Sequence, residues 1–174
     1  MTPRSPRGLM GRLAAWIEAA NRLAGLGAGL ILVAMVAMIS RETIGRYFFN
    51  NPTDWVVELS GYLLVGLVFL GGGYIMQQDA HLRVDIFYTR FTRRNRYLVD
   101  VLGYVLALPY LLLLLWQSSL LAWNAYDSME RSMIMRWPLW VPETLVPIGV
   151  LLLLLQVLVK AVRTIAALRH EPRR

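Results

Sequence analysis

The sequence predicts an all-α integral membrane protein whose four transmembrane helices form one bundle. Two observations support this fold class. Apolar residues make up 57% of the 174 residues and charged residues only 17%, whereas a soluble domain is nearer half apolar and a quarter charged. The apolar residues also fall into four long stretches with almost no charge, and a helix needs roughly 20 such residues to cross a bilayer core about 30 Å thick.

These stretches define the expected spans in chain order. Residues 23–40, 59–78 and 101–126 contain no charged side chain. The fourth stretch, residues 144–159, extends back to residue 137 across a single acid, Glu143. We therefore expect spans at about residues 23–42, 55–77, 98–125 and 140–163, within a membrane domain over residues 23–165 that is followed by a short tail, residues 166–174.

Residues 1–22 precede the first span and have a pattern of their own. Their apolar side chains recur at helical spacing, as Leu9, Leu13, Trp16, Ile17 and Ala20. Two structures fit this pattern: a short helix that lies in the inner membrane interface, or a cytoplasmic extension of the first span. The first apolar stretch runs into Ser40 without a small-x-small cleavage site, so we expect a retained span and not a cleaved signal peptide.

The basic residues predict the orientation of the chain in the membrane. Of the 18 Lys and Arg residues, 14 lie in the N-terminal segment, in the link between the second and third spans, and in the C-terminal part of the chain from Lys160 onward. Because basic loops stay on the cytoplasmic side, both termini are predicted to be cytoplasmic. The basic residues flank the spans and form no separate basic domain, so the lipid bilayer is the expected partner and nucleic acid is not.

Small residues within the spans predict close contacts between helices. Glycines are frequent in the first two spans, at Gly25, Gly27, Gly29, Gly66, Gly71, Gly72 and Gly73. Without a side chain at these positions, neighbouring helices can approach closely in lipid. Pro109 and Pro147 lie within the third and fourth spans, where a proline removes a backbone hydrogen bond and favours a kink.

The link between the first two spans has the most distinctive local sequence. Asn51 followed by Pro52 is typical of a helix N-cap and first helical position, so we expect the second helix to start there. Arg46 has two potential ion-pair partners. Glu42 lies four residues earlier on the same helix, and Glu58 lies across the hairpin.

The sequence contains no recognisable active site. Its two histidines, His81 and His170, lie outside the spans, so no histidine can bind haem within the membrane. The absence of cysteine excludes thiolate zinc sites, iron–sulfur clusters and disulfides, and no nucleotide-binding or hydrolase motif is present. His81 and Asp85 have a spacing that would suit a metal, but a single pair in a basic loop is more often structural. We therefore predict no enzyme activity, cofactor or bound metal.

Polar side chains inside the spans are few. Gln117 and Asn124 share a face of the third span, and Gln156 lies in the fourth. A transport pathway would need polar groups of this kind. Hydrogen bonds between helices, worth about 1 kcal/mol each, explain them as well, and we favour that interpretation.

Several short motifs resemble the small membrane subunit, or DctQ-type subunit, of tripartite ATP-independent periplasmic (TRAP) transporters. They are Arg46-Tyr47-Phe48 followed by Trp55 and Glu58, then His81-Leu82-Arg83-Val84-Asp85, Trp137-Pro138 and Leu145-Val146-Pro147-Ile148-Gly149. The resemblance covers about residues 20–167. It implies a non-catalytic subunit of the bacterial inner membrane that scaffolds a large transport subunit. The complete transporter would take up an organic acid together with ions, and a periplasmic binding protein would deliver the acid.

This resemblance makes the motif residues candidates for subunit contacts or structural roles. The candidates are Arg46, Trp55, Glu58, His81, Asp85, Gln117, Asn124 and Pro147. Two other functions remain open at this point. The chain could anchor a redox enzyme, which would need haem or quinone ligands in the spans, or it could form a small self-assembling channel with Gln117 and Asn124 in the pore.

Overall fold

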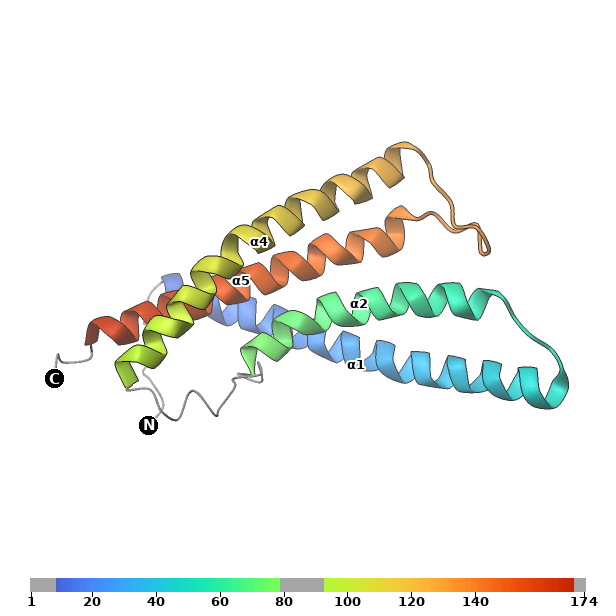
Figure 1. The fold of residues 1–174 in the computed structure, drawn as a ribbon, viewed down its shortest axis with the longest axis horizontal. Coiled ribbons are helices and arrows are strands. Elements are labelled where there is room, and N and C mark those ends of the chain that lie inside the picture. The colour runs from blue at the N-terminus through green and yellow to red at the C-terminus, as the bar shows by residue number, and fades with distance from the viewer. Residues whose placement is uncertain (1–8, 79–92, 171–174) are drawn as a thin grey trace.

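The computed structural model describes residues 9–78 and 93–170, in which the chain forms four long helices (Figure 1). They are α1 (Leu9–Phe49), α2 (Trp55–Gln77), α4 (Arg93–Asp127) and α5 (Trp140–His170). Each contains a stretch that is long and apolar enough to cross a membrane: Gly11–Phe49, Trp55–Gln77, Val99–Asp127 and Trp140–Ala166. The predicted fold class, all-α with four potential membrane-spanning helices, is therefore confirmed.

Residues 9–22, which precede the first apolar stretch, belong to α1. This helix continues without a break through residue 22, so the structure has the extension of the first span and not a separate interfacial helix. Two polar contacts join this part of α1 to α5. Glu18 forms an ion pair with Arg163 at 2.5 Å, and the Asn21 side chain is hydrogen-bonded to Gln156.

α2 and α5 are the central helices of the bundle. They pack against each other, while α1 packs mainly against α2 and α4 packs mainly against α5. Figure 1 shows the result as two helical hairpins, α1–α2 and α4–α5, that lie side by side. Because α1 and α4 each have one principal neighbour, most of their large apolar side chains are exposed on the surface of the chain.

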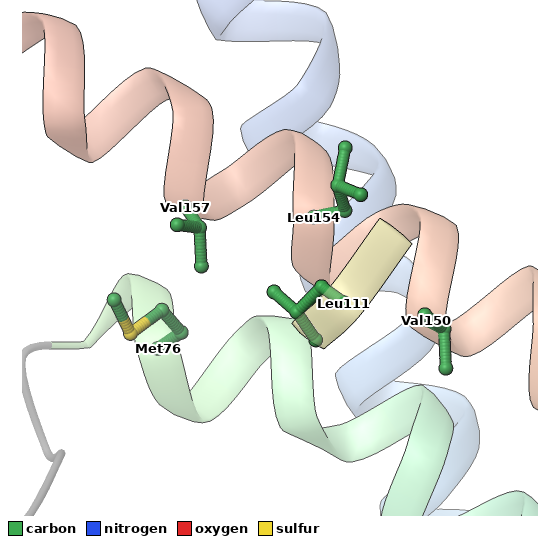
Figure 2. Close-up of a cluster of buried hydrophobic side chains, with 5 residues drawn as sticks. All are labelled: Met76, Leu111, Val150, Leu154 and Val157. Carbon is green, nitrogen blue, oxygen red and sulfur yellow. The ribbon is translucent and has the colours of Figure 1, made fainter. Parts of the chain in front are cut away.

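A cluster of buried apolar side chains joins three of the helices (Figure 2). It consists of Met76 from α2, Leu111 from α4, and Val150, Leu154 and Val157 from α5. In lipid the surroundings are as apolar as these side chains, so the hydrophobic effect contributes little to their association. Close van der Waals packing stabilises the cluster instead.

The expected close contacts are confirmed at some of the glycines. A Cβ atom added at Gly25 would overlap the Tyr74 ring, and one added at Gly73 would overlap the Asn21 side chain. At Gly66 the added atom would lie 3.2 Å from Leu145. The expectation is wrong for Gly27 and Gly29, where an added Cβ atom would have no atom of another helix within 4 Å.

Among the described glycines, Gly149 on α5 comes closest to the backbone of another helix. A Cβ atom at this position would lie 2.5 Å from the backbone carbonyl carbon and oxygen of Phe69 on α2. Pro147 lies two residues earlier, and both α5 and α4 continue through their internal prolines, Pro147 and Pro109. The expected kinks at these prolines remain predictions.

Candidate subunit-contact site

The α1–α2 link, residues 50–54, is held against the last turns of α1 by the Glu42 carboxylate. Glu42 is buried, and its oxygens accept hydrogen bonds from the Thr53 backbone N–H at 2.9 Å and from the Thr53 hydroxyl. The Asn51 N–H donates to the Gly45 carbonyl oxygen at 3.1 Å. Asn50 adopts a left-handed conformation with φ of 48°, which asparagine tolerates better than most residues. The link therefore folds back onto α1.

This geometry corrects the expected start of the second helix. α2 begins at Trp55 with Asp54 as its N-cap residue, so Asn51 and Pro52 do not occupy the N-cap and first helical positions. The physical reason is that Asn51 and Thr53 donate their N–H groups to α1, at Gly45 and Glu42. The segment therefore stays outside α2 and closes the end of α1.

Arg46 pairs with the nearer of its two potential partners. Its guanidinium Nη2 lies 3.3 Å from Glu42 Oε1, while the Arg46 side chain remains 54% exposed. The residues that follow it at the end of α1, Tyr47, Phe48 and Phe49, are strongly exposed. The motif that begins at Arg46 thus presents one cation and three aromatic rings on the surface.

Glu58 does not pair with Arg46 and instead binds the α4–α5 link, residues 128–139. Its Oε2 accepts hydrogen bonds from the backbone N–H groups of Ile134 at 3.2 Å and Met135 at 3.0 Å. Its Oε1 accepts one from the Tyr62 hydroxyl at 2.6 Å. A single carboxylate on α2 therefore fixes the tip of a link that lies about 76 residues further along the chain.

The α4–α5 link has a defined shape of its own. Arg131 and Pro138 form an isolated antiparallel bridge, and the Ser132 N–H donates to the Trp137 carbonyl oxygen at 2.8 Å. Met129 and Arg136 have positive φ angles of 50° and 54°. No glycine marks these two positions in the sequence, so local sequence signals could not have predicted this hairpin-like turn.

Aromatic contacts close the base of the same link. Tyr126 near the end of α4 packs edge-on against Trp140 at the start of α5, with ring centroids 5.8 Å apart. Trp123 lies 6.2 Å from Tyr126 in a tilted arrangement. Trp55, the first residue of α2, is 37% exposed at the same end of the bundle as both links (Figure 1).

A buried pair of amides joins α1 to α5 inside the bundle. Asn21 Nδ2 donates to Gln156 Oε1 at 3.1 Å and to the Ile17 carbonyl oxygen at 3.0 Å, and both amide side chains are almost fully buried. The expected interhelical hydrogen bond of Gln156 is therefore confirmed. Sequence reasoning missed its partner, because Asn21 lies before the first apolar stretch and there resembles a polar residue of an exposed helix face.

The other two amides behave differently. Gln117 and Asn124 are both exposed on α4, and within the described residues neither side chain forms a hydrogen bond with another helix. The pair therefore forms no interhelical hydrogen bond within the described part of this chain, and its role in subunit contacts stays a prediction. α4 buries the face that contains Leu111, Ser118 and Ala122, and the amides lie off that face.

Two of the predicted candidates, His81 and Asp85, lie outside the described residues. Within the described residues, no group of three or more His, Cys, Asp and Glu side chains is arranged to hold a metal ion. The structure therefore brings Arg46 together with Glu42, and Glu58 with the α4–α5 link. It leaves Gln117 and Asn124 on the surface.

The family model described as "Tripartite ATP-independent periplasmic transporters, DctQ component" matches residues 35–167. That match covers most of the chain. The chain belongs to the DctQ family. No curated protein matches it.

Membership of the DctQ family establishes the general role of the chain. It is the small membrane component of a TRAP transporter, and the family is one of transporter components and not of enzymes. Such a component belongs to a complex with the other TRAP components. The matched region runs from the middle of α1 to the last turns of α5, so it includes both links and the Gly149 contact. Asn21 lies before the matched region.

Proposed function

We propose that this DctQ subunit is a non-catalytic scaffold that holds the large TRAP transport subunit in the bacterial inner membrane. The complete transporter would take up an organic acid together with coupled ions, after a periplasmic binding protein delivers the acid. In this assembly the large subunit carries the substrate and ion sites. The small subunit contributes helix surfaces and the two links.

The observation that supports a scaffold most directly is the packed apolar interior. The contact between the central helices is filled by the cluster around Val150 and by the backbone contact of Gly149 with Phe69. The buried amides Asn21 and Gln156 are hydrogen-bonded to each other, and the Asn21 Oδ1 has no hydrogen-bond partner within the described residues. A pathway for ions or an organic acid would need ionisable or polar groups lining a cavity at this depth.

The proposal also includes an orientation. Both termini lie in the cytoplasm, because the basic residues concentrate in the terminal segments and in the link between the second and third spans. The α1–α2 and α4–α5 links then face the periplasm. There Arg46, Trp55 and the segment fixed by Glu58 are available to contact the binding protein.

Co-purification tests the scaffold function. The chain, expressed with the large subunit and carrying an affinity tag, is expected to retain that subunit in mild detergent. The isolated chain is expected to give no saturable binding of the transported acid by calorimetry, while the complex with the large subunit binds it. Saturable binding by the isolated chain, or failure of the large subunit to co-purify, would contradict the proposal.

Cysteine labelling tests the orientation, because the natural chain contains no cysteine. The Met133 side chain is 99% exposed at the tip of the α4–α5 link, so Met133→Cys should react with a membrane-impermeant maleimide in spheroplasts. Thr2→Cys in the N-terminal segment should react only after the membrane is permeabilised. The opposite pattern would show that the orientation is reversed.

A further inference from the structure

One face of α4 is exposed along its length and carries polar groups within an apolar span. Gly103, Tyr110, Gln117 and Asn124 follow one another at intervals of seven residues, and all four are exposed. Residues seven apart on a helix differ in direction by only about 20°, so they form one narrow face, called here the amide face. From the first to the last residue it extends about 32 Å at 1.5 Å per residue, which is close to the thickness of the bilayer core.

The position of Gln117 makes exposure to lipid unfavourable. This residue lies four positions from the middle of the span Val99–Asp127, or about 6 Å along the helix axis. That distance is well inside the bilayer core, whose half-thickness is about 15 Å. A primary amide has two donor hydrogens and an acceptor oxygen, and hydrocarbon satisfies none of them. Asn124 lies near the edge of the core, so Gln117 provides the stronger argument.

The exposed surfaces of the other described spans carry no amide side chains. Within the four described spans, exposed amide side chains occur only on α4. The outward face of α1 presents Leu23, Leu26, Leu30 and Val33, which suit contact with lipid chains. The chemical difference between α1 and α4 indicates that they face different surroundings.

We propose that the amide face of α4 binds a transmembrane helix of the large TRAP subunit that presents hydrogen-bonding side chains. This inference rests on the proposed scaffold function. The Gln117 and Asn124 amides exchange hydrogen bonds with polar groups of that helix, and Gly103 permits close approach at one end. The apolar face of α1 contacts lipid.

Paired substitutions test the contribution of the amides. Gln117→Leu combined with Asn124→Leu should weaken retention of the large subunit on the order of tenfold, the effect of losing two interhelical hydrogen bonds in a membrane. Ser119→Leu is the matched control, because Ser119 is also exposed on α4 but lies about 200° around the helix from Gln117. This control should leave retention unchanged.

The isolated double variant should melt at the wild-type temperature, since neither amide contacts another helix of the chain. Unchanged retention, or a lower melting temperature of the isolated variant, would overturn the inference.

Cross-linking identifies the occupant of the face without removing the amides. Leu113 lies one turn from Gln117 on the same side of α4, and it is 68% exposed. In the cysteine-free chain, Leu113→Cys carrying a photoreactive maleimide should cross-link to the large subunit in membranes. Leu30→Cys on α1 is the matched control and should not.

The possible outcomes separate this inference from the proposed function. If the large subunit co-purifies but cross-links only through Leu30→Cys, the docking face is α1 and the inference fails alone. A cross-linked dimer of the small subunit through Leu113→Cys would show that a second copy occupies the amide face. No cross-link at either position in a complex that co-purifies would indicate lipid on both faces. Failure of the wild-type pair to co-purify would overturn the scaffold function and the inference together.

Discussion

Replacing Gly149 by alanine adds one methyl group at a close backbone contact between the two central helices. The new Cβ would lie 2.5 Å from the carbonyl carbon and oxygen of Phe69, and 2.7 Å from the Phe69 Cβ. An ordinary contact of this kind is about 3.4 Å or longer, so α2 and α5 must separate by roughly 1 Å. No side-chain rotation can relieve the overlap, because the obstructing atoms belong to the backbone of another helix.

The free-energy cost follows from two opposing terms. Overpacking of a close contact destabilises a protein by about 1–3 kcal/mol, and an obstructing backbone favours the upper part of that range. Alanine is better than glycine within a helix by up to about 1 kcal/mol, which offsets part of the loss. We expect a net destabilisation of about 2 kcal/mol, equivalent to a fall in melting temperature of about 4–8 °C for a chain of this size.

The measurement is thermal unfolding of the purified chain in detergent, followed by the fluorescence of its six tryptophans. Gly29→Ala is the matched control, because no atom of another helix lies within 4 Å of its added methyl group. That variant should melt at or slightly above the wild-type temperature. Gly25→Ala should also melt below Gly29→Ala, since its methyl group would overlap the Tyr74 ring and lie 2.7 Å from the Tyr74 Cβ, and only the ring can turn away. A Gly149→Ala variant as stable as Gly29→Ala would refute the proposed backbone contact.

Four further substitutions test polar contacts. Glu58→Gln should leave the fold intact but loosen the tip of the α4–α5 link. The backbone amides of residues 134 and 135 should then exchange their hydrogens faster. Unchanged protection of these amides would contradict the role of the carboxylate. Gln156→Met should destabilise the chain by about 1 kcal/mol in thermal unfolding, because Asn21 loses its hydrogen-bond partner on α5. An equal or higher melting temperature would show that this hydrogen bond does not stabilise the chain. Arg46→Ala should change stability by no more than about 0.5 kcal/mol because the guanidinium is half exposed. Glu42→Ala should lower the melting temperature more than Arg46→Ala, since it leaves the Thr53 backbone N–H and hydroxyl without their acceptor. A larger fall for Arg46→Ala would contradict the role of Glu42 in holding the α1–α2 link.

The polar residues show where reasoning from sequence succeeds and where it fails. The ion pair between Glu42 and Arg46 is one of two alternatives that the sequence leaves open, and the structure decides between them. The contact of Glu58 with the α4–α5 link joins residues 76 and 77 positions apart, and no local pattern encodes such a separation. Asn51 has the sequence signature of an N-cap, but tertiary hydrogen bonds to α1 override it.

The sequence by itself determined the number of spans, the all-α fold class and the family resemblance. Each depends on features that are local in the chain, namely apolar stretches long enough for a bilayer and short motifs at their edges. Only the tertiary structure decided which faces of the helices are buried. Gly149 contacts a backbone while Gly29 contacts nothing, and Gln156 is bonded within the bundle while Gln117 is exposed on its surface. The physical reason is that a span in lipid is apolar on every side, so its periodicity does not distinguish the helix-facing side from the lipid-facing side.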